Sequence, residues 1–87
     1  MELKSNRELY DYLIALSAVL SSRGADELSG AVAIASRHAS GMSTEFLGEA
    51  RIALRRFQDD RSVLNESEWL DLVDVLRQLD QSFYHRG

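Results

Sequence analysis

Two histidines are the side chains of this sequence with the widest chemical range, since imidazole acts as a metal ligand and as a general acid or base near neutral pH. His38 has Ile34 and Met42 as its neighbours at four-residue spacing, and His85 lies close to the C-terminus. Neither has a histidine, aspartate or glutamate at the i, i+4 spacing that places two ligands on one helix face. We therefore expect no metal site. We interpret His38 as a structural residue near a helix end, where the helix dipole favours its charged form.

The other common ingredients of catalysis are also missing from the sequence. It contains no cysteine and no glycine-rich phosphate loop. None of its serines is paired with a base or with an oxyanion motif. We therefore expect a protein that is not an enzyme and that binds no cofactor.

The arginines Arg51, Arg55 and Arg56 suggest a different chemistry, the binding of nucleic acid. The stretch before them, residues 39–45, has the glycine, the apolar residue and the helix cap of a helix-turn-helix turn. The helix that follows would then lie in the major groove of DNA. Its first turns carry two glutamates, however, and the net charge of the chain is −4, which lowers affinity for a polyanion. DNA binding is therefore an alternative hypothesis, and a nucleic-acid partner is not favoured.

Asp80 is the acidic residue that falls within the apolar stripe of its helix, between Leu76 and Phe83. We expect it to lie in a solvated last helical turn. The alternative is a carboxylate paired with Arg51 or with an arginine of another subunit, because a charge among apolar side chains needs a partner.

The first amphipathic segment carries more apolar residues than one buried face requires. Tyr10 and Ile14, one turn apart, lie about 100–140° around the helix axis from the buried stripe, and Ala18 lies further along. A helix covered on most of its sides would also explain them. We favour the hypothesis that Tyr10, Ile14 and Ala18 form an interface for a second copy of the chain or for another protein.

Three further apolar residues, Ile34, Ile52 and Val75, also fall away from the main stripes of their helices. They would form a second apolar patch if those helices are neighbours. The sequence by itself does not place them side by side.

Start and stop signals divide the chain into four amphipathic helices. Ser5 and Glu8 have the spacing of a capping box, as do Asn65 and Glu68, and Gly24 ends the first helix. The predicted helices span about residues 6–22, 25–39, 44–58 and 66–83. Short links favour antiparallel neighbours, so the expected fold is an all-α, compact four-helix bundle, either up-and-down or built from two orthogonal helix hairpins.

Two of these helices have a distinctive buried face. The stripe of the second helix includes Ala31, Ala35 and Ala39, and such small residues predict tight packing against a neighbouring helix. In the fourth helix, the residues expected to face inward are Trp69, Leu72, Val73, Leu76, Leu79 and Phe83.

Length and composition narrow the class of protein. Eighty-seven residues make a single domain, residues 1–87, with a thin margin of stability, so self-association is a reasonable way to gain burial and a homodimer is expected. The sequence has no apolar run long enough to span a bilayer, and the N-terminus lacks the pattern of a secretory signal. With a pI near 5.0 and no cysteine, we expect a cytoplasmic protein without a membrane partner.

The length, the acidity and the four helices are similar to those of the colicin immunity proteins, and the chain also opens Met1-Glu2-Leu3-Lys4. Those proteins carry a paired-tyrosine motif before a proline on a short third helix, whereas this chain has no proline, so we do not assign it to that family. An immunity- or inhibitor-like role remains an alternative. Its acidic surface would consist of Glu45, Glu49, Asp59, Asp60, Glu66 and Glu68. The leading hypothesis is a non-catalytic module that binds itself or another protein.

Overall fold

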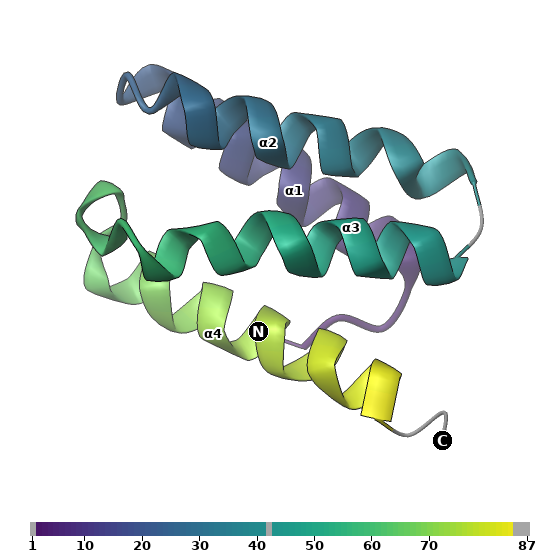
Figure 1. Ribbon diagram of the computed structural model, residues 1–87. Helices are drawn as coiled ribbons and strands as arrows, with labels where there is room; N and C mark the ends of the chain where they lie inside the picture. The colour runs from purple at the N-terminus through teal and green to yellow at the C-terminus, as the bar shows by residue number, and fades with distance from the viewer. Residues whose placement is uncertain (1, 42, 85–87) are drawn as a thin grey trace.

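The computed structural model describes residues 2–41 and 43–84, without the side chains of residues 43 and 82–84. Its α-helices are α1 (Asn6–Ser22), α2 (Asp26–Ser36), α3 (Ser43–Arg55) and α4 (Glu66–Tyr84). Short 3₁₀ turns follow as η1 (Arg37–Ser40), η2 (Arg56–Gln58) and η3 (Arg61–Val63). Successive helices run antiparallel beside one another, with α4 tilted across the end of the series (Figure 1). The all-α four-helix bundle is confirmed, and its arrangement is up-and-down.

The start signals work as the sequence predicts. The Asn65 side chain accepts a hydrogen bond from the Glu68 N–H at 2.8 Å, and the Glu68 carboxylate accepts one from the Asn65 N–H at 2.9 Å. At α1, Ser5 accepts from the Glu8 N–H at 3.3 Å. The Glu8 carboxylate instead accepts the N–H of Lys4, one residue earlier than in a standard capping box.

The ends of the two central helices differ from the prediction. α2 stops at Ser36, and residues 37–40 tighten into a 3₁₀ turn, whereas the apolar pattern predicted helix to residue 39. α3 likewise stops at Arg55 before a 3₁₀ turn over residues 56–58. Tightening of the last turn is a common way to satisfy carbonyls at a helix end. Gly24, with φ of +79°, adopts the left-handed conformation that turns the chain from α1 into α2.

The core lies between the helices and is filled mainly by leucine and phenylalanine. Phe46, Phe57 and Leu13 are fully buried. Val75 is also fully buried, which corrects the expectation that it lies outside the main stripe of α4, and Val73 is only half-buried. The side chain of Phe83 and the residues Met42 and His85 lie outside the described part of the structure.

The contact between α1 and α2 is the closest one in the bundle. Ser17 and Ser29 bind each other reciprocally: the Ser17 Oγ donates to the Ser29 carbonyl at 3.1 Å, and the Ser29 Oγ donates to the Ser17 carbonyl at 2.9 Å. Such side-chain-to-backbone bonds require two backbones that lie close together. The close packing of α2 against α1 therefore runs through Ser29, whereas Ala31 and Ala35 of the predicted small-residue stripe lie in the groove between α2 and α3.

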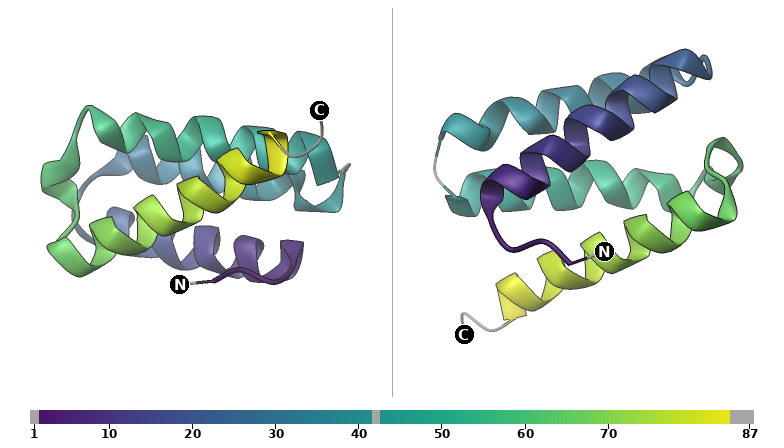
Figure 2. Two further views of the ribbon diagram at one scale, coloured as in Figure 1. Left: turned by 90° about the horizontal axis from the view of Figure 1, so that it is seen from below. Right: turned by 180° about the vertical axis from the view of Figure 1, so that it is seen from behind.

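Residues 2–5 form an N-terminal arm that precedes α1. It leaves the start of α1 and crosses toward α4 (Figure 2), where the Leu3 N–H donates to the Gln78 side chain at 2.8 Å. At the other end, Arg23 after α1 forms two hydrogen bonds to the Glu68 carboxylate, at 2.6 and 2.8 Å. These bonds from Arg23, with the one from the Asn65 N–H, lower the pKa of Glu68. Among the described residues, no helix is both long enough and apolar enough to cross a bilayer.

Candidate functional site

The most exposed large apolar side chain in the described residues is Ile52 on α3, at 63%, and Ile34 on α2 is 55% exposed. Both line one shallow groove of about 180 Å³ between these helices. The rest of its lining is Ala31, Ala35, Glu49, Ala53 and Arg56. Pockets for drug-sized ligands run to about 300–1,000 Å³, so the groove is too small for such a ligand and better fits side chains of another protein.

Helical periodicity explains why these two isoleucines face outward. Ile52 lies two residues from each of the buried Ala50 and Leu54, which turns it about 200° away from both. Ile34 lies two residues from the buried Val32. A large apolar side chain on the outer face of a helix does not contribute to the core of its own chain.

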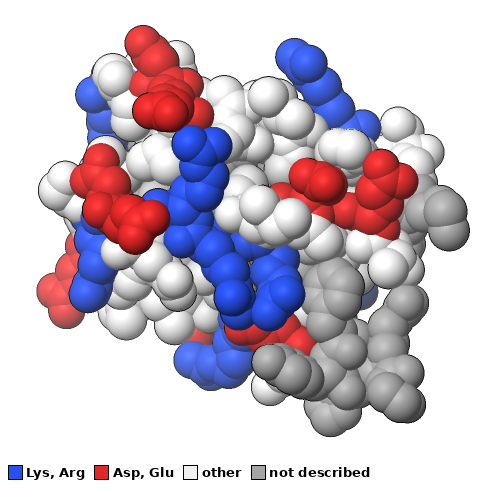
Figure 3. All heavy atoms as spheres, viewed as in Figure 1, with Lys and Arg blue, Asp and Glu red and all other residues white. Residues whose placement is uncertain are grey.

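Charged residues of opposite sign border the groove in an alternating pattern. At one end, Arg56 of η2, directly after α3, contacts Glu27 of α2 at 3.4 Å. At the other end, His38 after α2 contacts Glu45 of α3 at 3.2 Å. Because the helices are antiparallel, acidic and basic positions exchange places from one end to the other. On the face that Figure 3 shows, a group of acidic side chains lies at the right and Lys and Arg side chains run through the middle, with uncoloured surface between them.

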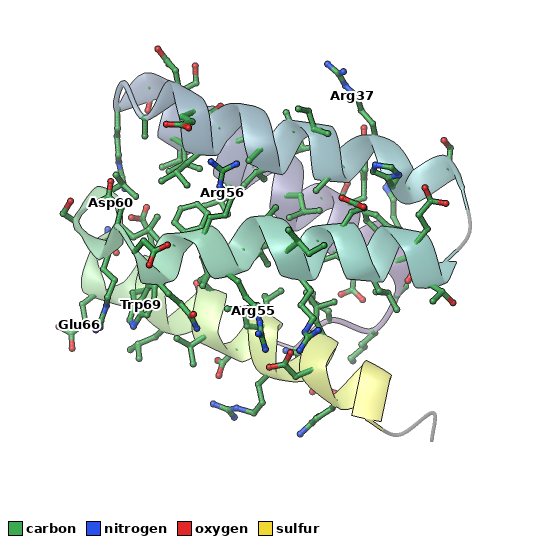
Figure 4. The ribbon with its side chains drawn as sticks, viewed as in Figure 1. Arg37, Arg55, Arg56, Asp60, Glu66 and Trp69 are labelled. Atoms are coloured by element: carbon green, nitrogen blue, oxygen red, sulfur yellow. The ribbon has the colours of Figure 1, made fainter. Side chains whose placement is uncertain are left out.

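Glu49 and Arg56 lie at opposite ends of the groove itself. Glu49 is half-buried, and within residues 2–41 and 43–84 its carboxylate has no side-chain hydrogen bond or ion pair. Arg56 reaches from η2, at the end of α3, toward α2, whereas Arg37 points away from the groove (Figure 4). The Glu27 partner of Arg56 is 88% exposed, so solvent weakens this pair.

The isoleucine of the predicted α1 interface is less exposed than either isoleucine of the groove. Ile14 is 43% exposed and Ala18 is exposed. Tyr10 is half-buried, packs against the core and lies under the Arg7 guanidinium at 5.9 Å from the ring centre. Tyr10 also forms part of an open cleft of about 570 Å³ that Arg37 borders. The three residues follow one another at four-residue spacing and so share one side of α1.

The three arginines proposed for DNA are engaged in ion pairs within the bundle. Arg51 and Arg55 both bind Asp80, and the Arg55 Nη2 to Asp80 Oδ1 distance is 3.2 Å. Moreover, α2 and α3 lie side by side and antiparallel (Figure 1), whereas a helix-turn-helix crosses its helices at about 90–120°. The geometry therefore gives no support to the DNA-binding alternative.

The same contacts correct the expectation for Asp80. Its side chain is 31% exposed and paired with two arginines, so it does not lie in a freely solvated last turn. Partial burial raises the pKa of this carboxyl, but the hydrogen bond from Arg51 and the charges of Arg51 and Arg55 outweigh burial and lower the pKa overall. The pair joins α3 to α4. The sequence indicated such a pair by the position of Asp80 within the apolar stripe of its helix, between Leu76 and Phe83.

The acidic residues of the inhibitor-like alternative do not form one free surface. Glu45 contacts His38, and Glu68 is bound by Arg23 and by its own helix start. Asp60 and Glu66 lie at the far end of the bundle, near Trp69 (Figure 4).

His38 is half-buried at the end of the bundle where α2 passes into η1. Its Nδ1 lies beside Glu45, and no group of three or more histidine, aspartate or glutamate side chains in that part of the chain is arranged to hold a metal ion.

Comparison of the chain with protein-family models, with curated proteins and with solved structures finds no match.

The sequence raised the possibility of a patch formed by Ile34, Ile52 and Val75, and the structure brings together only the first two. For each isoleucine, the residues two positions before and two positions after it are buried, so the helical period turns the isoleucine outward. What the sequence did not reveal is that α2 and α3 place these outer positions beside each other.

Proposed function

We propose that this chain is a non-catalytic protein-binding module, and that its binding surface is the groove between α2 and α3. The observation that carries the proposal is the pair Ile34 and Ile52, two exposed apolar side chains from different helices in one groove. Scattered apolar residues are normal on protein surfaces, but two that converge between charged borders have the composition of a small interface.

This proposal moves the interface from α1, where the sequence favoured it, to the neighbouring face of the bundle. Ile14 is less exposed than either isoleucine of the groove, and Tyr10 is partly used by the core. Cytoplasmic location is part of the proposal and rests on composition.

The test is site-specific photo-crosslinking in cells that express the chain. A photoreactive residue in place of Ile52 is expected to form one defined protein adduct. The matched control replaces Leu70 of α4, which is 57% exposed but does not line the groove, and no adduct is expected there. A third variant carries the same residue at position 14. Adducts at position 14 but not at position 52 would return the interface to α1, and no adduct at either position would refute the proposal.

A further inference from the structure

We infer that the occupant of the α2–α3 groove is a second copy of this chain, docked with its α3 antiparallel to the first. The inference rests on the proposed function and names its partner. Isologous two-fold dimers are the commonest oligomers, and they require a surface that is complementary to itself. The groove meets this requirement in both charge and position.

The charge argument starts from the two ends of the groove. Glu49 lies at one end and Arg56 at the other. Their separation of seven residues corresponds to about 10.5 Å along the helix axis, too far for Glu49 of α3 and Arg56 of η2 in one chain to pair with each other. In an antiparallel pair of α3 helices, the same separation places Glu49 of each copy opposite Arg56 of the other. Two equivalent ion pairs then form across the interface.

The position argument concerns the centre of that pairing. The midpoint between residues 49 and 56 falls at Ile52 and Ala53, so the two-fold axis passes beside the most exposed isoleucine. Ile52 of one copy then meets Ile52 of the other, and Ile34 flanks the contact. The apolar centre and polar border are those of a protein interface.

The contact also supplies what the single chain lacks. The half-buried Glu49 carboxylate has no side-chain partner in the described ranges, and Arg56 has only a weak contact to an exposed glutamate. Docking gives both groups a partner where solvent is partly excluded, and charge pairs gain strength there.

The size of the chain sets the expected affinity. A standard interface takes about 800 Å² from each partner, which is about 15% of the 5402 Å² surface of this chain. A face of two short helices provides at most that area, so we expect a dimer with Kd of the order of micromolar.

The experiment is sedimentation velocity on the purified chain, from about 1 to 500 μM to bracket that Kd. The expected mass rises from 9.8 kDa toward twice that value. Glu49→Arg and Arg56→Glu each place like charges opposite one another and are expected to weaken association about tenfold or more. The double variant, Glu49→Arg with Arg56→Glu, restores opposite charges and regains association. An equimolar mixture of the two single variants forms the heterodimer, because both of its cross-pairs are complementary.

Matched controls separate association from folding. Glu27→Gln removes the partner of Arg56 within the same chain. Arg56 itself keeps its positive charge, so association is expected to be unchanged. Ile52→Asp is expected to abolish the dimer, whereas Leu70→Asp, at a similarly exposed position, leaves it intact. Circular dichroism checks that every variant keeps the helicity of the parent chain.

Three results would overturn the inference. A monomer at every concentration, with a crosslinked partner of different mass at position 52, refutes the dimer but leaves the proposed function standing. A monomer without any adduct refutes both. A dimer that is lost with Ile14→Asp and survives Ile52→Asp would show that two copies meet through α1 instead.

Discussion

Replacement of Asp80 by asparagine tests whether the ion pairs between α3 and α4 stabilise the bundle. Asparagine keeps the shape of the side chain and one acceptor oxygen, but it removes the charge that attracts Arg51 and Arg55. The side chains of Asp80 and Arg51 are 31% and 28% exposed, so this site lies between a surface ion pair and a buried one. Surface pairs contribute up to about 1 kcal/mol, and breaking a buried pair costs about 3–5 kcal/mol. We expect Asp80→Asn to lower the free energy of unfolding by about 1–2 kcal/mol at pH 7.

The effect should depend on pH in a defined direction. The pKa of Asp80 is lowered in the folded chain, whereas an unfolded aspartate has a pKa of about 3.9. The stabilisation is therefore complete well above pH 4, and it is lost as the pH falls through the folded pKa. The difference between the parent chain and Asp80→Asn should be largest near pH 7 and should vanish in strong acid.

Urea unfolding, followed by circular dichroism at pH 7 and at about pH 2, measures this difference. The control is Asp11→Asn, which removes an ion pair with Arg7 on the surface. The Arg7 side chain is 80% exposed and the Asp11 side chain is 60% exposed. We expect a loss below about 0.5 kcal/mol there. If Asp80→Asn is no worse than Asp11→Asn, or if its effect persists unchanged in acid, the assigned role of Asp80 is wrong.

Three other changes test the core, a helix start and the half-buried phenol of Tyr12. Phe46→Ala removes a fully buried ring and should lower the free energy of unfolding by about 3–5 kcal/mol, a large part of the stability of so small a domain. Urea unfolding measures this loss, and a loss below about 1 kcal/mol would contradict the placement of Phe46 in the core. Asn65→Ala should cost about 1 kcal/mol through loss of the cap on α4, whereas an unchanged midpoint would mean that water replaces the cap. Burial, with the charges of Asp71 and Glu68, raises the pKa of Tyr12, so its folded form favours the neutral phenol. The contribution of Tyr12 to the free energy of unfolding should thus be present below about pH 10 and lost at higher pH. In Tyr12→Phe, which cannot ionise, the free energy of unfolding should fall less at alkaline pH than in the parent chain.

The features that could be predicted from the sequence are those that depend on near neighbours in the chain. The cap formed by Asn65 and Glu68 needs only residues three positions apart, and it forms as expected. The start of α1 and the left-handed Gly24 are local in the same sense. The four-helix class follows because a 3.6-residue period is visible in any amphipathic segment.

The rotation of each helix about its axis was decided by packing in three dimensions. The sequence pattern placed Val73 on the inward face of α4 and Val75 outside it, whereas contact with the other helices buries Val75 and leaves Val73 half-buried. The partners of Asp80 also depended on that rotation, since Arg51 lies 29 residues away in the chain.

The candidate site combines both kinds of information. The sequence determined by itself that Ile34 and Ile52 lie opposite the buried faces of their own helices, because side-chain direction follows the helical period. Only the tertiary structure decided that those two outward positions line a single groove, with Glu49 and Arg56 at its ends. The physical reason is that helical direction is set by hydrogen bonds within a few residues, whereas the meeting of two faces is set by how the whole core packs.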